Sequence, residues 1–457
     1  MSEAVLKYLE DNRESLLKKM ENFLSIPSVS TDSSNKQDVL KAADFVANYL
    51  KEIGFHSVEI KETAGHPLVY AEWLEEKDAQ TALFYGHYDV QPADPYELWD
   101  SEPFQPEIRN GRIFARGASD DKGQVFMHLA VFEAYMKTEG RLPMNLKVCI
   151  EGEEEIGSEN LYPFLEDHKD KLTSDFAIIS DSGMVEKGQP TMLYGLKGFT
   201  GLEFHVQGPN RDLHSGLYGG AVKNPAMAMS HLLASLKNPD EYVTVPGFYD
   251  DVEKLADEER AMMNQAPGEN YTESIGIPET MPEKGFTVNE HLMARPTLEI
   301  NGLTSGYQGQ GTKTIIPSTA SAKITCRLVP GQDPQKIQDL LVDYIENNAP
   351  KGVSVSVKRE PLSAKAYKVD PNHPLLQKAA DNLADAFGKD TVFVRLGGSI
   401  PVVESIDQMF GIPVVLLGFG TPEDNLHSPN ESFPLDHFDK GMEVLVKYYR
   451  DVAYLEK

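Results

Sequence analysis

The sequence contains few cysteines and no long apolar segment. Only two of its 457 residues are cysteine, Cys149 and Cys326, which excludes a disulfide framework and a cluster of thiolate metal ligands. No stretch approaches the roughly 20 consecutive apolar residues that cross a bilayer. The first twenty residues are charged throughout and lack the apolar centre of a signal peptide. We therefore expect a cytoplasmic protein that does not bind membranes.

Positive charge is also scarce. The chain has 43 Lys and Arg residues against 71 Asp and Glu residues, a formal net charge of −28. Such a field repels phosphate, so neither nucleic acid nor an anionic lipid surface is expected as the main partner. Hydrophobic residues make up 40% of the chain, an ordinary share for a protein with a buried core. The length predicts two or three domains.

Short apolar runs alternate with helical patterns at both ends of the chain, which is typical of layered α/β domains. From about residue 194 the order changes to β-α-β-β-α-β, the pattern of a compact α+β unit. We predict a three-layer α/β/α domain over 1–194 and 365–457, interrupted by a ferredoxin-like α+β domain over 195–364. The second domain contains a long acidic segment, about 239–294. A loop of this length is usually functional or poorly ordered.

Clusters of His, Asp and Glu recur where predicted strands end. They are His87 with Asp89, Asp120 with Asp121, the run Glu151 to Glu155, Asp181, and His427. Each cluster alone is explained by ordinary hydrogen bonds, helix caps or a solvated acidic loop. Together they fall at the sheet edge where open α/β folds place their sites. Oxygen and imidazole ligands without thiolate indicate a hard or borderline divalent metal.

The sequence resembles the zinc-dependent aminoacylase/carboxypeptidase family of co-catalytic metallopeptidases, and within it the branch of cytosolic non-specific dipeptidases and carnosinases. The motifs that carry the resemblance span nearly the whole chain in order: GHYDVQP, WDSEPF, GRIFARGASDDKG, EGEEEIGSE, DLHSG, CRLVP, GGSIP and HSPNE. The resemblance implies a homodimeric hydrolase in which the inserted domain is a lid and dimerisation domain. It also implies two divalent metal ions per chain, zinc first, with manganese or cobalt accepted by the same ligands.

The resemblance assigns a role to each matching residue. It implies that the metal ligands are His87, Asp120, Glu155, Asp181 and His427, with Asp120 bridging the two ions. Asp89 is expected to orient His87, and Glu154 to act as the general base. The peptide bond between Asp120 and Asp121 is expected to be cis.

Four residues of the inserted domain and its neighbourhood complete the expected site. His214 matches the family histidine that stabilises the oxyanion, which in dimeric relatives reaches the site from a neighbouring subunit. Arg327 is expected to hold the C-terminal carboxylate of the substrate, because a guanidinium binds a carboxylate through two parallel hydrogen bonds. Ser399 and Thr314 match polar substrate contacts of the dipeptidase branch.

The expected reaction is hydrolysis of dipeptides or short peptides that have a free C-terminal carboxylate. Two alternatives stay open from the sequence. One is an amidohydrolase of the same family that removes an acyl group from an amino acid. The other is a binding relative that kept the fold and lost the chemistry, which the complete ligand set and Glu154 disfavour.

Overall fold

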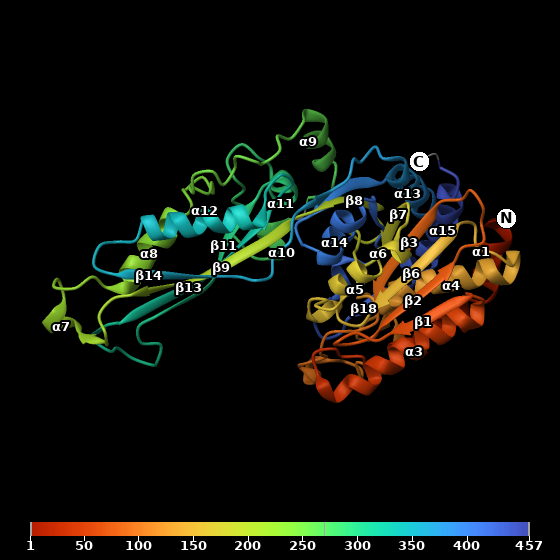
Figure 1. Ribbon diagram of the computed structural model, residues 1–457, viewed down its shortest axis with the longest axis horizontal. Coiled ribbons are helices and arrows are strands. Elements are labelled where there is room, and N and C mark those ends of the chain that lie inside the picture. The colour runs from red at the N-terminus through yellow and green to blue at the C-terminus, as the bar shows by residue number, and fades with distance from the viewer. Residues whose placement is uncertain (1, 269, 456–457) are drawn as a thin grey trace. The chain divides into compact units, whose positions relative to one another are not determined.

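The computed structural model describes residues 2–268 and 270–455 (Figure 1). Its contacts divide the chain into two units. The first contains residues 1–194, 369–393 and 401–457, and the second contains residues 195–368 and 394–400. The boundaries expected from the sequence are 194/195 and 364/365. At the other end, residues 365–368 and 394–400 group with the second unit, although the sequence pattern assigned them to the first domain.

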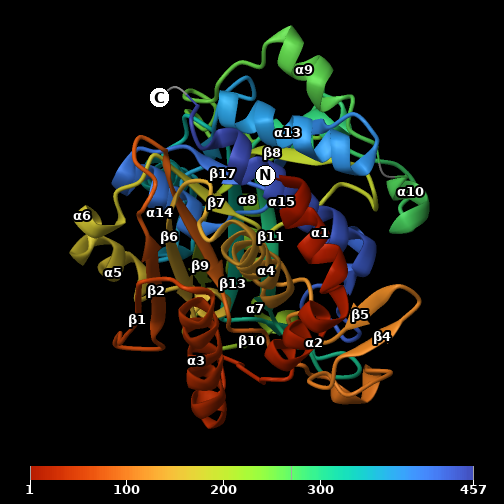
Figure 2. The same ribbon diagram turned by 90° about the vertical axis from the view of Figure 1, so that its right-hand side faces the viewer.

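The first unit contains a mixed sheet with helices on both faces (Figure 2). Its helices are α1 (Ser2–Asp11), α2 (Arg13–Leu24), η1 (Ser33–Asn35), α3 (Lys36–Ile53), η2 (Tyr96–Leu98), α4 (Lys122–Glu139), η3 (Glu154–Ile156), α5 (Leu161–Asp167), α6 (Lys169–Leu172), α13 (Pro374–Phe387), α14 (Pro401–Phe410), η4 (Pro422–Asp424) and α15 (Leu435–Val452). Helices α3 and α4 contact strands of the sheet, and α14 contacts both the sheet and α5. The predicted three-layer α/β/α arrangement is confirmed.

The large sheet has the order β1-β2-β6-β3-β7-β17-β8-β15, with β16 also pairing with β8; β15 and the last residues of β8 and β16 are among the residues that group with the second unit. These strands are β1 (Ser57–Lys61), β2 (Leu68–Trp73), β3 (Thr81–His87), β6 (Asn145–Glu151), β7 (Phe176–Ile179), β8 (Thr191–Leu196), β15 (Tyr367–Lys368), β16 (Val392–Leu396) and β17 (Val414–Leu416). Strands β6, β3, β7 and β17 are parallel, so their carboxyl ends share one edge. A separate small sheet contains β4 (Glu107–Arg109), β5 (Arg112–Phe114) and β18 (Ser432–Pro434).

Helix α4 is more deeply buried than its sequence pattern predicts. The apolar stripe from Val125 to Met136 predicts a helix with one buried face. In the structure every residue from Lys122 to Tyr135 is buried, because α1, α2, α3 and α15 surround the sides that the sheet leaves open. The N-terminal segment forms two helices, α1 and α2, which are separated at Asn12.

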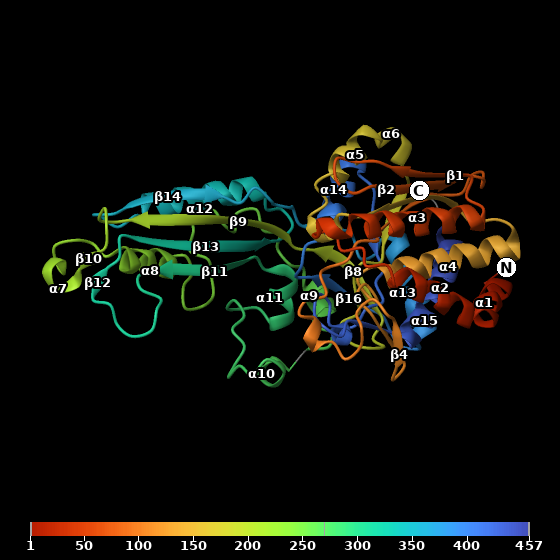
Figure 3. The same ribbon diagram turned by 90° about the horizontal axis from the view of Figure 1, so that it is seen from below.

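The second unit has the predicted β-α-β-β-α-β order. Its elements are β9 (Gly198–Gln207), β10 (Leu213–His214), α7 (Ser215–Tyr218), α8 (Pro225–Ser235), α9 (Asp257–Met263), α10 (Tyr271–Ser274), α11 (Val288–Ala294), β11 (Thr297–Ser305), β12 (Ile315–Ile316), β13 (Thr319–Leu328), α12 (Pro334–Asn347) and β14 (Ser354–Arg359). The sheet order β11-β13-β9-β14 is antiparallel throughout. Helices α8 and α12 cover one of its faces (Figure 3).

The acidic segment 239–294 is folded rather than structureless. It contains α9, α10 and α11, and its carboxylates pair with cations of the second unit. Glu290 is almost fully buried and pairs with Arg260, and Glu283 pairs with Arg295 in the same way. Within the described residues, no helix is long and apolar enough to span a membrane.

Candidate metal centre

The five clusters of the sequence analysis meet at the carboxyl ends of the parallel strands. His87 is the last residue of β3, and Glu151 is the last residue of β6. Asp181 follows β7 by two residues, and His427 lies in the chain that follows β17. Asp120 precedes α4, and the peptide bond between Asp120 and Asp121 is cis, as the resemblance implies.

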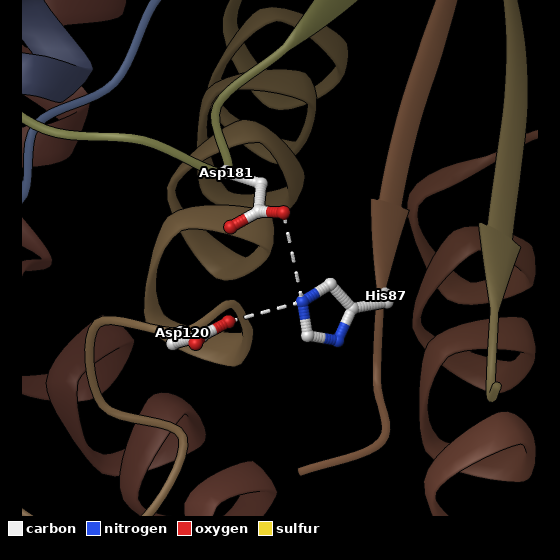
Figure 4. A group of neighbouring side chains, drawn as sticks. All are labelled: His87, Asp120 and Asp181. Atoms are coloured by element: carbon white, nitrogen blue, oxygen red, sulfur yellow. Dashed lines mark hydrogen bonds and ion pairs between the residues drawn. The ribbon is translucent and has the colours of Figure 1, made fainter. Parts of the chain in front are cut away.

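The acidic and imidazole side chains form two groups that share Asp120. The first group contains His87, Asp120 and Asp181, shown in Figure 4. The second contains Asp120, Glu155 and His427. His87 Nε2 lies 3.1 Å from Asp120 Oδ1 and 4.0 Å from Asp181 Oδ2. His427 Nε2 lies 2.9 Å from Asp120 Oδ2 and 3.3 Å from Glu155 Oε2. The two oxygens of Asp120 therefore face different histidines.

These spacings fit a divalent cation in each group. The Nδ1 of His87 lies 3.0 Å from the backbone oxygen of Asp89, so this nitrogen carries the ring proton. Although burial opposes it, hydrogen bonds with Asp120 and Asp89 raise the pKa of His87 well above its ordinary value, so without a cation Nε2 also carries a proton, which it donates to Asp120. A bound cation would take the place of that proton. Two ligand atoms that bind one zinc ion at angles of 90–110° are about 2.9–3.4 Å apart. Three of the four contacts fall in this range.

The Asp89 carboxylate does more than orient His87. Its Oδ1 lies 3.4 Å from His87 Nδ1, farther away than the Asp89 backbone oxygen. The same carboxylate accepts hydrogen bonds from the backbone N–H groups of Glu154 and Glu155, at 3.2 and 3.1 Å. Asp89 thus links the end of β3 to the segment that carries these two glutamates.

The acidic groups of the site have strongly perturbed pKa values. Burial, followed by the charges of Asp181 and other nearby carboxylates, raises the pKa of Glu154 to about 9, although His87 opposes this. Burial and Asp120 likewise raise the pKa of Asp181 to about 7. Burial would also raise the pKa of Asp120, but hydrogen bonds with His427 and His87 outweigh it and hold that pKa below its usual range. Carboxylates crowded in this way favour a bound cation.

Two other glutamates of the acidic run do not belong to either group. Glu153 accepts hydrogen bonds from the backbone N–H of His66 and from Asn160, so it holds two loops together. Glu151 is buried and accepts hydrogen bonds from the hydroxyls of Tyr85 and Ser158. Although four glutamates fall within five residues of the sequence, these two are held in hydrogen bonds of their own.

Several residues behind the site were not identified from the sequence. Gln91, which lies in the GHYDVQP motif, donates a hydrogen bond of 2.8 Å to Glu155 Oε2. His128 contacts Ser180, the residue before Asp181: its Nε2 is 2.7 Å from Ser180 Oγ, and its Nδ1 is 2.8 Å from Tyr449 Oη. The Ser180 hydroxyl donates to the Leu417 oxygen, so His128 must donate through Nε2 and accept through Nδ1. Their partners come from distant segments, which a linear pattern does not show.

The inserted unit places its four expected site residues in two separate pairs. His214 and Thr314 lie together, because β10 pairs with β12 and Ser215 donates its N–H to the Thr314 oxygen. Arg327 donates a hydrogen bond of 3.1 Å to Ser399 Oγ. Strand β13 runs between the pairs, and its eight residue steps from Thr319 to Arg327 span about 26 Å. A dipeptide extends only about 7 Å, so one chain's His214 and Arg327 cannot contact the same dipeptide.

The surroundings of Arg327 are electropositive. Burial alone lowers the pKa of Arg327, with no carboxylate among the described residues acting on its guanidinium, which lies 5.3 Å from the Phe199 ring centre. Lys197 is nearly fully buried, and burial together with Arg327 and Arg295 lowers its pKa to about 7. The Arg327 guanidinium, with the Lys197 amine near it, therefore suits an anionic group.

Comparison with known proteins decides the family. Residues 83–451 match the description of peptidase family M20/M25/M40. The chain belongs to this peptidase family. The resemblance inferred from the motifs is confirmed, and the protein is an enzyme of the metallopeptidase class.

Relatives from the family match over almost the whole chain. The Cys-Gly metallodipeptidase dug1 of Schizosaccharomyces pombe is 29% identical, covering 97% of this chain and 97% of its own. The human Beta-Ala-His dipeptidase is 27% identical, covering 99% and 93%. Among solved structures, the M20 family metallo-carboxypeptidase Sso-CP2 of Sulfolobus solfataricus has a TM-score of 0.84 at 30% identity, covering 95% and 98%. The dipeptidase Dug1p of Saccharomyces cerevisiae has a TM-score of 0.81 at 27% identity, covering 100% and 99%.

Proposed function

We propose that this enzyme hydrolyses dipeptides that have a free C-terminal carboxylate, using two divalent metal ions. The observation that best supports this function is the pair of side-chain groups that share Asp120, with Glu154 beside them. The relatives named as dipeptidases support the substrate class. The relative named as a metallo-carboxypeptidase supports a requirement for the free carboxylate.

Each metal ion would be held by three side chains, with Asp120 common to both sites. His87, Asp120 and Asp181 would hold one ion, and Asp120, Glu155 and His427 the other. The family's usage favours zinc, and manganese or cobalt would suit the same oxygen and imidazole ligands. When bound, two such ions would lower the pKa of a coordinated water toward about 7 and would polarise the scissile carbonyl.

Glu154 would move the proton of the reaction. Its high pKa in the ion-free arrangement makes its carboxylate a good proton acceptor, and the cations would lower that pKa into the working range. Glu154 would accept a proton from the attacking water and deliver it to the leaving amine. Asp89 would serve this step indirectly, because it holds the backbone of residues 154 and 155.

Arg327 and Ser399 would bind the carboxylate of the substrate. Their hydrogen bond preorganises the guanidinium, and the absence of a described carboxylate partner leaves that cation available for an anionic ligand. Thr314 would contact the substrate from the His214 end, so its role depends on the assembly described next.

We propose a homodimer in which His214 completes the site of the partner. The distance along β13 supports this, because Arg327 and His214 of one chain are too far apart for one small substrate. His214 Nδ1 accepts a hydrogen bond from the Gly216 N–H. The neutral ring therefore carries its proton on Nε2, where it can donate to an oxyanion.

A substrate panel tests the proposed function. Metal-loaded enzyme would be assayed with Cys-Gly, β-Ala-His and other dipeptides, with N-acetyl amino acids, and with dipeptide amides that lack the carboxylate. We expect hydrolysis of free dipeptides and weak activity on the amides. Preferential cleavage of N-acyl amino acids would favour the amidohydrolase alternative. No turnover of any member with zinc, manganese or cobalt would favour the non-catalytic alternative.

Asp120→Ala tests the bridging role separately. We expect the variant to lose both metal ions, because its carboxylate belongs to both groups. Metal content after gel filtration would be measured by mass spectrometry. Retention of two ions per chain would contradict the bridging assignment.

A further inference from the structure

A buried carboxylate outside the metal groups holds the Asp120 loop. Glu431 is fully buried, and its Oε1 accepts hydrogen bonds from the backbone N–H groups of Ser119 and Asp120, at 3.0 and 3.1 Å. Its Oε2 accepts from the Gly117 N–H at 2.9 Å. Three backbone donors of residues 117–120 thus surround one carboxylate, an arrangement that binds anions well.

The charge of Glu431 is matched by a buried arginine that also contacts the His427 loop. Arg116 Nη1 donates to Glu431 Oε2 at 2.7 Å, and both side chains are almost fully buried. Arg116 Nη2 donates to the backbone oxygens of Pro92 and Ser428, at 3.1 and 3.3 Å. Ser428 immediately follows His427. The ion pair therefore bonds to the loop of Asp120 and to the loop of His427 at once.

The chain around His427 has no internal regular structure to position it. Asn425, His427 and Asn430 all have positive φ angles, 57°, 59° and 62°, which are uncommon for residues other than glycine, although Asn and His adopt them more readily than most. Glu431 lies four residues after His427. Both its side chain and its backbone are held, because its backbone oxygen accepts a hydrogen bond from the Ala115 N–H. The contacts of residues 428–431 thus fix the end of this loop.

We infer that Glu431 is a positioning residue that sets the distance between Asp120 and His427, and thereby the affinity of the second metal site. This inference rests on the proposed two-metal centre. His87 and Asp181 approach from β3 and β7, so the first site keeps two ligands that the Glu431 contacts do not hold. Two of the three ligands of the second site, Asp120 and His427, lie on the two loops that Glu431 and Arg116 hold, and only Glu155 lies outside them. Loss of Glu431 should therefore weaken the second site more than the first.

Glu431→Gln tests the inference, because the side chain keeps its size but loses its charge and one acceptor oxygen. The amide N–H₂ group would face backbone donors or Arg116. Partners that orient metal ligands usually change metal affinity by about 10–100-fold. We expect that loss in the second dissociation constant, measured by calorimetric titration of metal-free protein with Zn²⁺. The first constant should change by a few-fold at most, and kcat should recover at saturating Zn²⁺.

Glu290→Gln is the matched control. Glu290 is also nearly fully buried, also pairs with an arginine, and also accepts a backbone N–H, from Thr287, but it lies in the inserted unit. Glu290→Gln should destabilise the metal-free protein and leave both metal affinities unchanged. Glu431→Asp keeps the charge but reaches fewer backbone donors, so it should give an intermediate loss. If Glu431→Gln does not fold, the two metal dissociation constants would be measured on Glu431→Asp instead.

The outcomes separate this inference from the proposed function. Unchanged affinities in the Glu431 variants, or equal weakening of both sites, would overturn the positioning role. The same loss in Glu290→Gln would also overturn it, because the effect would then follow general destabilisation. If the parent protein itself binds fewer than two ions, the proposed two-metal function fails before the variants are compared.

Discussion

Glu153, Glu154 and Glu155 are consecutive, but their carboxylates have three different environments. Glu153 bonds to the neighbouring loop, Glu155 belongs to the second metal group, and Glu154 is buried beside both groups with a raised pKa. The turn of η3 points the three identical side chains in different directions. Asp89 holds this turn in place, because its carboxylate accepts the backbone N–H groups of Glu154 and Glu155. Each residue can be tested on its own.

Replacing Glu154 with glutamine should strongly reduce kcat and leave metal binding intact. The amide cannot accept the proton of the attacking water, so we expect kcat to fall by about 10²–10⁴-fold. Steady-state kinetics and metal analysis would be run on the same preparation. Glu153→Gln is the adjacent control and should keep near-normal kcat, because its carboxylate contacts His66 and Asn160 instead. Near-normal turnover by Glu154→Gln would refute its role.

His128 should make the metal-free protein less stable in mild acid. Burial lowers its pKa to about 3, below the ordinary value of 6.5, so the unfolded chain binds a proton that the folded chain does not. Stability should therefore fall as the pH drops from about 6.5 toward 3, with a slope near 1.4 kcal/mol per pH unit from this residue. Urea unfolding at pH 6.5, 5.5 and 5.0 would be compared with His128→Gln. Equal slopes in both proteins would contradict the prediction.

At the scale of elements, the start of α4 sits against the loop that carries Asp120. A Cβ atom at Gly123 would lie 1.9 Å from the Ala118 backbone oxygen, and the Gly123 N–H donates to the Gly117 oxygen. This close approach requires glycine. It places the first turn of the helix directly behind the residues that Glu431 holds.

Gly123→Ala should therefore displace the Asp120 loop. We expect weaker binding of both metal ions and a lower unfolding temperature, measured by metal titration and by differential scanning calorimetry. Gly268→Ala is the control, because that glycine is exposed and a Cβ atom added to it would meet no described atom within 4 Å. It should leave both quantities unchanged. Normal metal affinity in Gly123→Ala would show that the loop can move without cost to the site.

Most elements could be predicted from local patterns, and the failures have physical causes. The ferredoxin-like unit follows from alternation and helical periodicity, which are local properties. The complete burial of α4 depends on α1 and α15, which come from opposite ends of the chain. Similarly, His87 and Asp120 could be proposed from motifs, whereas the contacts of Gln91, His128 and Glu431 join segments far apart in sequence.

At the scale of the whole molecule, the proposed dimer predicts complementation between two inactive variants. Glu154→Gln removes the base of its own site, and His214→Ala removes the donor given to the partner. A mixed dimer would contain one site with both defects and one site with neither. We expect activity to return when the two proteins are mixed under conditions that exchange subunits.

The control is each variant mixed with itself, which should stay inactive. Native mass spectrometry would establish the fraction of mixed dimers, and activity should rise with that fraction. Mixed dimers without recovered activity would mean that His214 does not act in the partner's site. An oxyanion donor is usually worth about 10²–10³-fold in kcat, so the recovery should be readily measured.

The position of β17 between β7 and β8 has a consequence for synthesis of the chain. Strand β7 ends at Ile179, but β17 begins only at Val414. At 5–20 residues per second, the ribosome needs roughly 12–47 s to add the roughly 235 residues between them. During that interval the edge of β7 has no native partner, and the nascent sheet is open to pairing with other chains. A chaperone that covers this edge would act until the last tenth of the polypeptide emerges.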